Sequence, residues 1–211
     1  MSKSKIHIIG NSHIDPVWLW DKAEGIDEVI NTFKSACDRL DEYPSLKFTA
    51  SSITFYKWVE MHAPAVFERM KEHIKSGRWE IVGNWLVEAD TNLPVTESFR
   101  KSEEISTKFT MSRFGIRSDV AYSPDTFGHP ASLPTVLAET GFKYYIFSRP
   151  SRQEKADLPG DLFYWEHKGN KILCQRLRYH YSLGPGWHKD SVLQILNDPE
   201  LLYKNLGCVF F

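Results

Sequence analysis

Short apolar runs alternate along the chain with longer stretches in which apolar residues recur at every third or fourth position. A short run bounded by polar or turn residues is typical of a buried strand, whereas the recurring spacing is typical of an amphipathic helix. The runs predict strands at Ile6–Ile9, Phe48–Ser51, Trp79–Val82, Asp119–Ala121 and Tyr144–Phe147. The spacing predicts helices from Ile26 to Leu40, Val66 to Ile74, Val95 to Phe114 and Leu133 to Thr140. This order favours an α/β fold, with a parallel sheet or barrel and helices outside it.

The last part of the chain departs from this alternation. Leu162–His167 and Lys171–Leu177 flank a short polar turn and predict a hairpin. A further helix is expected from Ser191, and a final strand at Gly207–Phe211. The sequence stops within that apolar strand, whose backbone and side chains need neighbours. We therefore expect residues 1–211 to form a single α/β domain that is incomplete at its C-terminal end.

Composition narrows the class of protein. The 211 residues suffice for one domain with a buried core. With 26 basic and 27 acidic residues the formal net charge is −1, which favours neither nucleic acid nor an anionic membrane surface. Cys37, Cys174 and Cys208 are too few and too far apart to indicate a disulfide framework or a thiolate zinc site. The start lacks the pattern of a signal peptide, so a cytoplasmic protein is expected.

The first candidate site follows the first predicted strand, in the segment from Asn11 to Trp18. His13 and Asp15 are two positions apart and point to the same side of an extended chain. An imidazole nitrogen and a carboxylate oxygen can then reach one Zn²⁺, and Trp18 is near enough to form a wall of the same pocket. The alternative is a polar turn in which His13 is hydrogen-bonded to the backbone.

The second candidate site follows the strand near Val120, in the segment from Ser123 to Pro130. A carboxylate such as Asp125 at a strand end can ligate a metal or attack an anomeric carbon. Phe127 offers an apolar face for a sugar ring. The alternative is that Asp125 caps the helix that begins near Leu133.

Other strand ends carry weaker signals. The segment from Gly83 to Pro94 mixes carboxylates, an amide and an indole, as sugar sites do, but it also suits an ordinary polar loop. Arg149 follows the fifth strand and could form a forked hydrogen bond to a carboxylate or to hydroxyls. Tyr181 stands just beyond the hairpin and is ambiguous by itself.

The chain resembles the N-terminal catalytic domain of family 38 glycoside hydrolases, the α-mannosidases, in motifs that occur in the same order. They are H-I-D-P-V-W, W-L-V-E-A-D-T-N-L-P, S-P-D-T-F-G-H and A-S-L-P-T-V-L-A-E-T-G-F-K-Y-Y. The likeness extends from about Ile6 to Leu177 and is nearest to the bacterial and cytosolic branch. It implies a parallel β/α barrel of the seven-stranded type found in glycoside hydrolases and deacetylases, incomplete at the C-terminal end.

The resemblance also implies roles for individual residues. It assigns His13, Asp15 and Asp125 as ligands of a zinc ion, with cobalt as the alternative metal. Asp125 is in addition the expected catalytic nucleophile. Trp18, Phe127, Arg149 and Tyr181 are expected to bind the sugar, Tyr181 on a weaker alignment. The family's general acid and its fourth metal ligand are expected beyond residue 211.

The implied activity is retaining, metal-dependent hydrolysis of terminal α-mannosidic bonds, with mannose-containing oligosaccharides as substrates. This chain alone is expected to be close to inactive, because the general acid is not among the matched residues; the alternative is that Glu88, Asp90 or another local carboxylate replaces it. Two alternatives stay open: a non-catalytic fragment that binds sugar or metal, and a metal-dependent carbohydrate deacetylase. The deacetylase would need a downstream H-x-x-x-H motif, which the sequence lacks. The sequence leaves homo-oligomer formation open.

Overall fold

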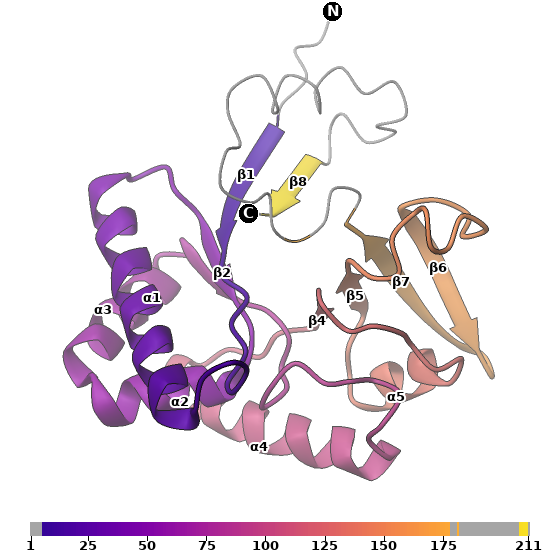
Figure 1. The fold of residues 1–211 in the computed structure, drawn as a ribbon, viewed down its shortest axis with the longest axis horizontal. Coiled ribbons are helices and arrows are strands. Elements are labelled where there is room, and N and C mark those ends of the chain that lie inside the picture. The colour runs from indigo at the N-terminus through magenta and orange to yellow at the C-terminus, as the bar shows by residue number, and fades with distance from the viewer. Residues whose placement is uncertain (1–5, 178–180, 182–206, 211) are drawn as a thin grey trace, which may run out of the picture.

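A computed structural model describes residues 6–177, 181 and 207–210 (Figure 1). The strands are β1 (Ile6–Asn11), β2 (Phe48–Ala50), β3 (Trp79–Ile81), β4 (Val120–Ser123), β5 (Tyr144–Phe147), β6 (Leu162–His167), β7 (Asn170–Arg176) and β8 (Gly207–Phe210). The helices are α1 (Lys22–Glu42), α2 (Ile53–His62), α3 (Pro64–Lys75), α4 (Thr96–Phe114) and α5 (Leu133–Glu139). The predicted strands and helices within this part of the chain are confirmed to within a few residues, and α2 is an addition. The helix expected from Ser191 lies outside the described residues.

The strands form two four-stranded sheets, in the orders β3-β2-β1-β8 and β4-β5-β7-β6. All neighbouring pairs are parallel except β6 with β7, the predicted hairpin. A backbone hydrogen bond of 2.8 Å from Gly83 N–H to the Val120 carbonyl links the end of β3 to the start of β4. The mixed α/β fold with parallel sheets is thus confirmed. A closed, wholly parallel seven-stranded barrel is not seen in the described strands, because the ladder breaks between β3 and β4 and β6 runs antiparallel.

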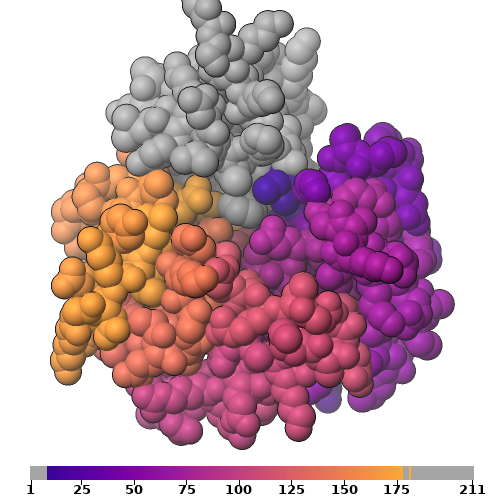
Figure 2. All heavy atoms as spheres, turned by 180° about the vertical axis from the view of Figure 1, so that it is seen from behind, coloured from indigo at the N-terminus to yellow at the C-terminus, as the bar shows by residue number. Residues whose placement is uncertain are grey.

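Each sheet packs on its own apolar core. Around β1–β3, helices α1, α2 and α3 bury a cluster that includes Trp79, Phe33 and Tyr56 at no more than 1% exposure. Around β4, β5 and β7, helix α5 buries a second cluster with Tyr145 and Leu137. In the space-filling view the N-terminal part and the β5–β7 part lie on opposite sides, with α4 below and between them (Figure 2).

Local sequence signals explain where several helices begin and end. Asp21 caps α1 by accepting from the backbone N–H groups of Ala23 and Glu24, and the Glu24 carboxylate accepts from the Asp21 N–H. This reciprocal arrangement is a capping box, a strong signal for a helix start. Gly115 ends α4 with φ of +68°, a conformation that glycine adopts without strain. Among the residues that the structure describes, no helix is both long and apolar enough to cross a membrane.

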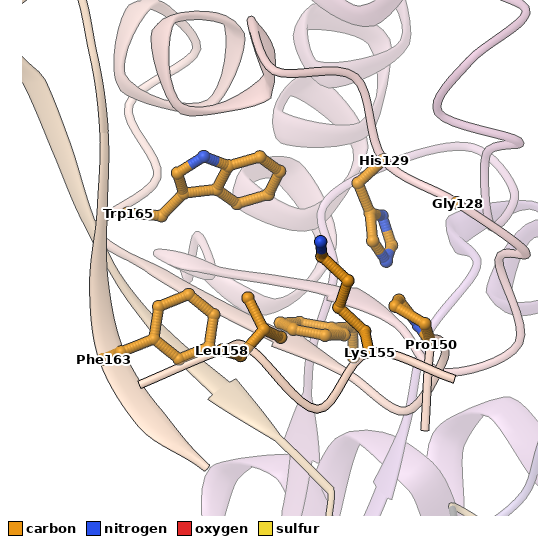
Figure 3. Close-up of a pocket in the computed structure, with 8 residues that line it drawn as sticks. Gly128, His129, Pro150, Lys155, Leu158, Phe163 and Trp165 are labelled. Atoms are coloured by element: carbon orange, nitrogen blue, oxygen red, sulfur yellow. The ribbon is translucent and has the colours of Figure 1, made fainter. Parts of the chain in front are cut away.

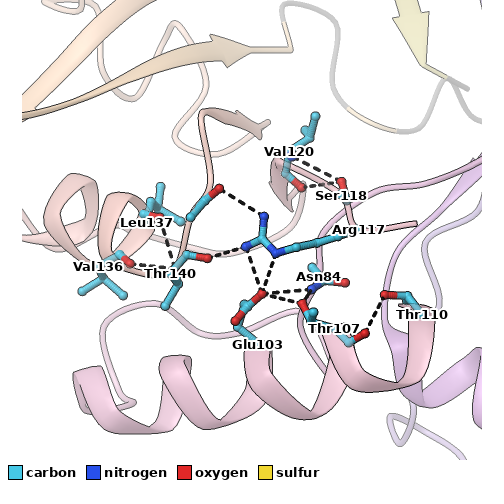
Figure 4. A network of polar contacts seen from close by, with 11 residues as sticks. Asn84, Glu103, Thr107, Thr110, Arg117, Ser118, Val120, Val136, Leu137 and Thr140 are labelled. Carbon is cyan, nitrogen blue, oxygen red and sulfur yellow. Dashed lines mark hydrogen bonds and ion pairs between the residues drawn. The ribbon is translucent and has the colours of Figure 1, made fainter. Parts of the chain in front are cut away.

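A polar network ties α4 to both halves of the fold (Figure 4). Glu103 on α4 accepts from Thr107 Oγ1, from Asn84 Nδ2 in the loop after β3, and from Arg117 Nε at 2.9 Å. The Arg117 guanidinium also donates to the carbonyls of Thr140 and Gly141 at the end of α5. The network therefore fixes the loop after β3, which contributes to the candidate site, against the second sheet.

Arg117→Ala is expected to destabilise the fold by about 2 kcal/mol, between the values for exposed and buried ion pairs. The Glu103 side chain is 16% exposed and would lose its cation while staying mostly buried. The midpoint of urea unfolding measures the change, with the slope unaltered. Arg100→Ala, which removes an exposed pair with Glu139, is the matched control and should shift the midpoint less. Equal shifts for both variants would contradict a stabilising role for the network.

Candidate active site

Parallel pairing brings the candidate residues to one edge of the fold. His13 and Asp15 follow β1, Glu88 lies in the loop after β3, Asp125 follows β4 and Arg149 follows β5. The carboxyl ends of parallel strands are where active sites form in such folds, because the connecting loops converge there. The structure thus brings together side chains from four separate strand ends.

The His13 imidazole is at the centre of this group. Its Nε2 atom lies 3.8 Å from Asp15 Oδ1 and 3.8 Å from Asp125 Oδ2. Its Nδ1 atom lies 3.0 Å from Glu88 Oε2. Burial lowers the pKa of His13, but the hydrogen bond and charge of Glu88 and the charges of the two aspartates together raise it above its usual value.

Arg149 holds the carboxylate of Asp125. Arg149 Nε donates to Asp125 Oδ1 at 2.6 Å, a short charge-assisted hydrogen bond. Asp125 Oδ2 is the oxygen that faces His13, so the two oxygens have different neighbours. The bond to Asp125 raises the pKa of Arg149, which keeps the guanidinium charged.

Two aromatic rings contact residues of the site. The Tyr181 ring lies 4.8 Å from the His13 ring, between centroids, and burial together with the charge of Asp125 raises the pKa of Tyr181 to about 12. The Arg149 guanidinium lies over the Phe127 ring at 5.2 Å. Phe127 is 76% exposed and Trp18 is 62% exposed, although both are large and apolar. Phe127 thus offers a solvent-facing ring beside Arg149, whereas the Trp18 ring packs edge-on against Trp20 at 5.3 Å between centroids.

The side-chain types suit a metal ion, but the distances between their donor atoms are longer than in a metal site. Within the described part of the chain, no group of three or more His, Cys, Asp or Glu side chains is arranged to hold a metal as it stands. The 3.8 Å separations exceed the ~3.3 Å between two ligands of a tetrahedral zinc, so the donors would have to move by a fraction of an ångström. His13 Nε2 is nevertheless buried without a hydrogen-bond partner, between two carboxylates. An unpartnered imidazole nitrogen in such surroundings is suited to a cation.

An apolar cavity of about 310 Å³ is lined by residues of β5, of β6 and of the loop after β4 (Figure 3). Phe147, Phe163 and Trp165 line it, and His129 stands at its rim with Nε2 2.7 Å from the Arg149 carbonyl. Burial lowers the pKa of His129, so its ring tends to be neutral. The contact with the Arg149 backbone connects the wall of the cavity to the residue that holds Asp125.

From the sequence, Glu88 was considered only as an alternative general acid and was not among the predicted site residues. The structure places Glu88 between His13 and the backbone of Asp125, with contacts to both. In the sequence, Glu88 stands two residues before Asp90 in a polar loop, which indicates only weakly that it belongs to the site. Only the pairing of β1, β2 and β3 in one sheet brings the loop to His13.

Comparison with known proteins identifies the family. A model described as the glycosyl hydrolases family 38 N-terminal domain matches residues 3–203. The chain belongs to this family. Alpha-mannosidase G of Dictyostelium discoideum is 32% identical over 165 residues, and an alpha-mannosidase of Saccharomyces cerevisiae is 30% identical over 163 residues. The matches cover 78% and 77% of this chain but 15% of each relative.

The fold of this family-38 domain also matches a solved structure. The crystal structure of an alpha-mannosidase from Enterococcus faecalis V583 superposes with a TM-score of 0.79 at 21% identity. The match covers 90% of this chain and 22% of that one. The resemblance drawn from the motifs is confirmed. The roles of individual residues, the metal and the cytoplasmic location stay predictions.

Proposed function

We propose that this chain supplies the nucleophile and part of the metal site of a retaining, metal-dependent α-mannosidase. The observation that supports it most is the environment of Asp125. One of its oxygens is held by Arg149 at 2.6 Å, and the other faces the unpartnered nitrogen of His13 at 3.8 Å. The homologous alpha-mannosidases, which extend far beyond the matched region, supply the substrate class.

The proposed chemistry begins with Asp125. In a retaining glycosidase a carboxylate attacks the anomeric carbon, the bond to the leaving oxygen breaks, and a covalent glycosyl-enzyme forms that water then hydrolyses. Arg149 orients the carboxylate through the 2.6 Å hydrogen bond from its guanidinium. His13, Asp15 and Asp125 would hold zinc, with cobalt as the alternative, and a bound cation would engage sugar hydroxyls and stabilise developing charge.

The exposed rings give the sugar its place. Trp18 from the loop after β1 and Phe127 from the loop after β4 present apolar faces to solvent at the same strand-end edge. Sugar rings carry C–H groups that pack on such faces while their hydroxyls bond to charged groups. We propose that Trp18, Phe127, Arg149 and Tyr181 together bind a terminal mannose of an oligosaccharide.

The test uses an aryl α-mannoside with added zinc or cobalt, and compares this chain with a version extended to the length of its relatives. The extended protein should hydrolyse the substrate and release mannose first as the α-anomer, detected by NMR. The 211-residue chain alone should be slower by about 10²–10⁴-fold or more, the usual contribution of a general acid. First release of the β-anomer would exclude retention. Equal turnover by the two proteins would show that the acid lies within this chain.

A further inference from the structure

Glu88 contacts two parts of the candidate site at once. Its side chain is 14% exposed and reaches from the loop after β3 towards residues that follow β1 and β4. Its Oε1 accepts from the backbone N–H groups of Asp125 at 2.7 Å and Thr126 at 3.0 Å. Its Oε2 lies 3.0 Å from His13 Nδ1. One carboxylate therefore links the imidazole to the backbone that carries Asp125.

The contact with Glu88 indicates which nitrogen of His13 carries the proton. Glu88 Oε2 is buried without a well-aligned hydrogen bond, and an ionised carboxylate only accepts, so His13 Nδ1 at 3.0 Å is assigned as its donor. In the neutral ring the lone pair is then on Nε2. Nε2 is the buried nitrogen without a partner, and it faces both Asp15 and Asp125 at 3.8 Å.

We propose that Glu88 is a positioning residue, which fixes His13 in its Nδ1–H tautomer and holds the Asp125 backbone beside it. The same carboxylate thereby presents the Nε2 lone pair and aligns the segment that carries the nucleophile. A carboxylate on the far nitrogen of a ligating histidine orients the ring and strengthens it as a ligand. The consequence for metal binding rests on the proposed function, whereas the consequence for the tautomer does not.

Glu88→Gln tests the tautomer of His13, because the glutamine amide accepts hydrogen bonds at one end and donates them at the other. The two backbone N–H groups require the amide oxygen at the Oε1 position, so the NH₂ group faces His13 Nδ1. Nδ1 must then accept, and the proton moves to Nε2. We expect ¹⁵N NMR of the metal-free chain, at alkaline pH where the ring is neutral, to show Nδ1–H in the wild type and Nε2–H in the variant.

Zinc affinity provides the second readout. Loss of such a supporting carboxylate typically weakens metal binding by about 10–100-fold, and competition with a chelator measures this change. Asp90→Asn is the matched control from the same loop, since Asp90 accepts from the Asn92 N–H through Oδ1, which asparagine can retain. The control should keep the Nδ1–H tautomer and the wild-type affinity.

The outcomes distinguish this inference from the proposed function. An Nε2–H tautomer in the wild type would overturn the inference, and this measurement needs no variant to fold. Zinc bound equally by the wild type and Glu88→Gln, with one unchanged tautomer, would also overturn it while leaving the metal site in place. A tautomer that switches in a chain without zinc affinity would support the positioning role and refute the metal-dependent part of the proposed function.

Discussion

Asp125→Ala is expected to lower kcat for an aryl α-mannoside by about 10⁴-fold or more in the extended protein, a loss in the range of nucleophile removal in other hydrolases. The variant takes away the atom that would attack the anomeric carbon and leaves Arg149 without the partner at 2.6 Å. Asp119→Asn is the control: it lies just before β4 and pairs with Lys143 in an exposed position. Its kcat should stay near that of the wild type.

Azide distinguishes loss of the nucleophile from loss of the metal site. In Asp125→Ala a small anion can enter the space of the missing carboxylate. It can then attack an activated α-mannosyl substrate from the face that Asp125 would attack, opposite the leaving group. The leaving group departs, and the expected product is the β-mannosyl azide. Rescue with this stereochemistry supports the nucleophile role. An α-mannosyl azide would place the nucleophile elsewhere and reduce Asp125 to a ligand or a binding residue.

Helix α2 was not predicted, and its first residues depend on contacts with a segment distant in the sequence. Its N-cap, Ser52, has φ of +64° and makes no side-chain cap hydrogen bond. The first N–H groups of the helix, from Ile53 and Thr54, donate instead to the carbonyls of Trp85 and Leu86. This cap comes from a segment distant in the sequence, and Ser52, although of a residue type common at helix starts, does not cap the helix with its side chain. By contrast α1 was predicted from its apolar spacing, with a start at Ile26 instead of the observed Lys22.

The candidate site was likewise predictable only where its residues are close in sequence or follow a predicted strand. His13 and Asp15 are near neighbours in sequence, and their shared direction follows from an extended chain. The position of Asp125 followed from placing its motif at the end of a parallel strand. Glu88 could not be assigned in this way, because its contact with His13 depends on the sheet order β3-β2-β1, in which β2 lies between the strands that precede the two residues. The break between β3 and β4, bridged at Gly83, is likewise a tertiary feature that no periodicity indicates.

His13→Ala is expected to weaken zinc binding by more than about 100-fold, beyond the effect of a supporting residue, because it removes a proposed ligand outright. The exposed His62 at the end of α2 is the matched control for losing an imidazole. A thermal scan with and without zinc measures the difference. At a zinc concentration 100 times Kd the wild type and His62→Ala should gain about 2.7 kcal/mol of stability, and His13→Ala almost none.

The direction of this effect follows from the buried Nε2 atom. Without a metal that nitrogen has no hydrogen-bond partner, whereas Nδ1 lies 3.0 Å from the mostly buried Glu88 carboxylate. Alanine at this position should therefore lower the stability of the metal-free fold, because Glu88 loses its neighbour, and the response to zinc should disappear in addition. If His13→Ala keeps the full zinc-induced shift, the cation binds elsewhere, and the group of His13, Asp15 and Asp125 is a hydrogen-bonding cluster rather than a metal centre.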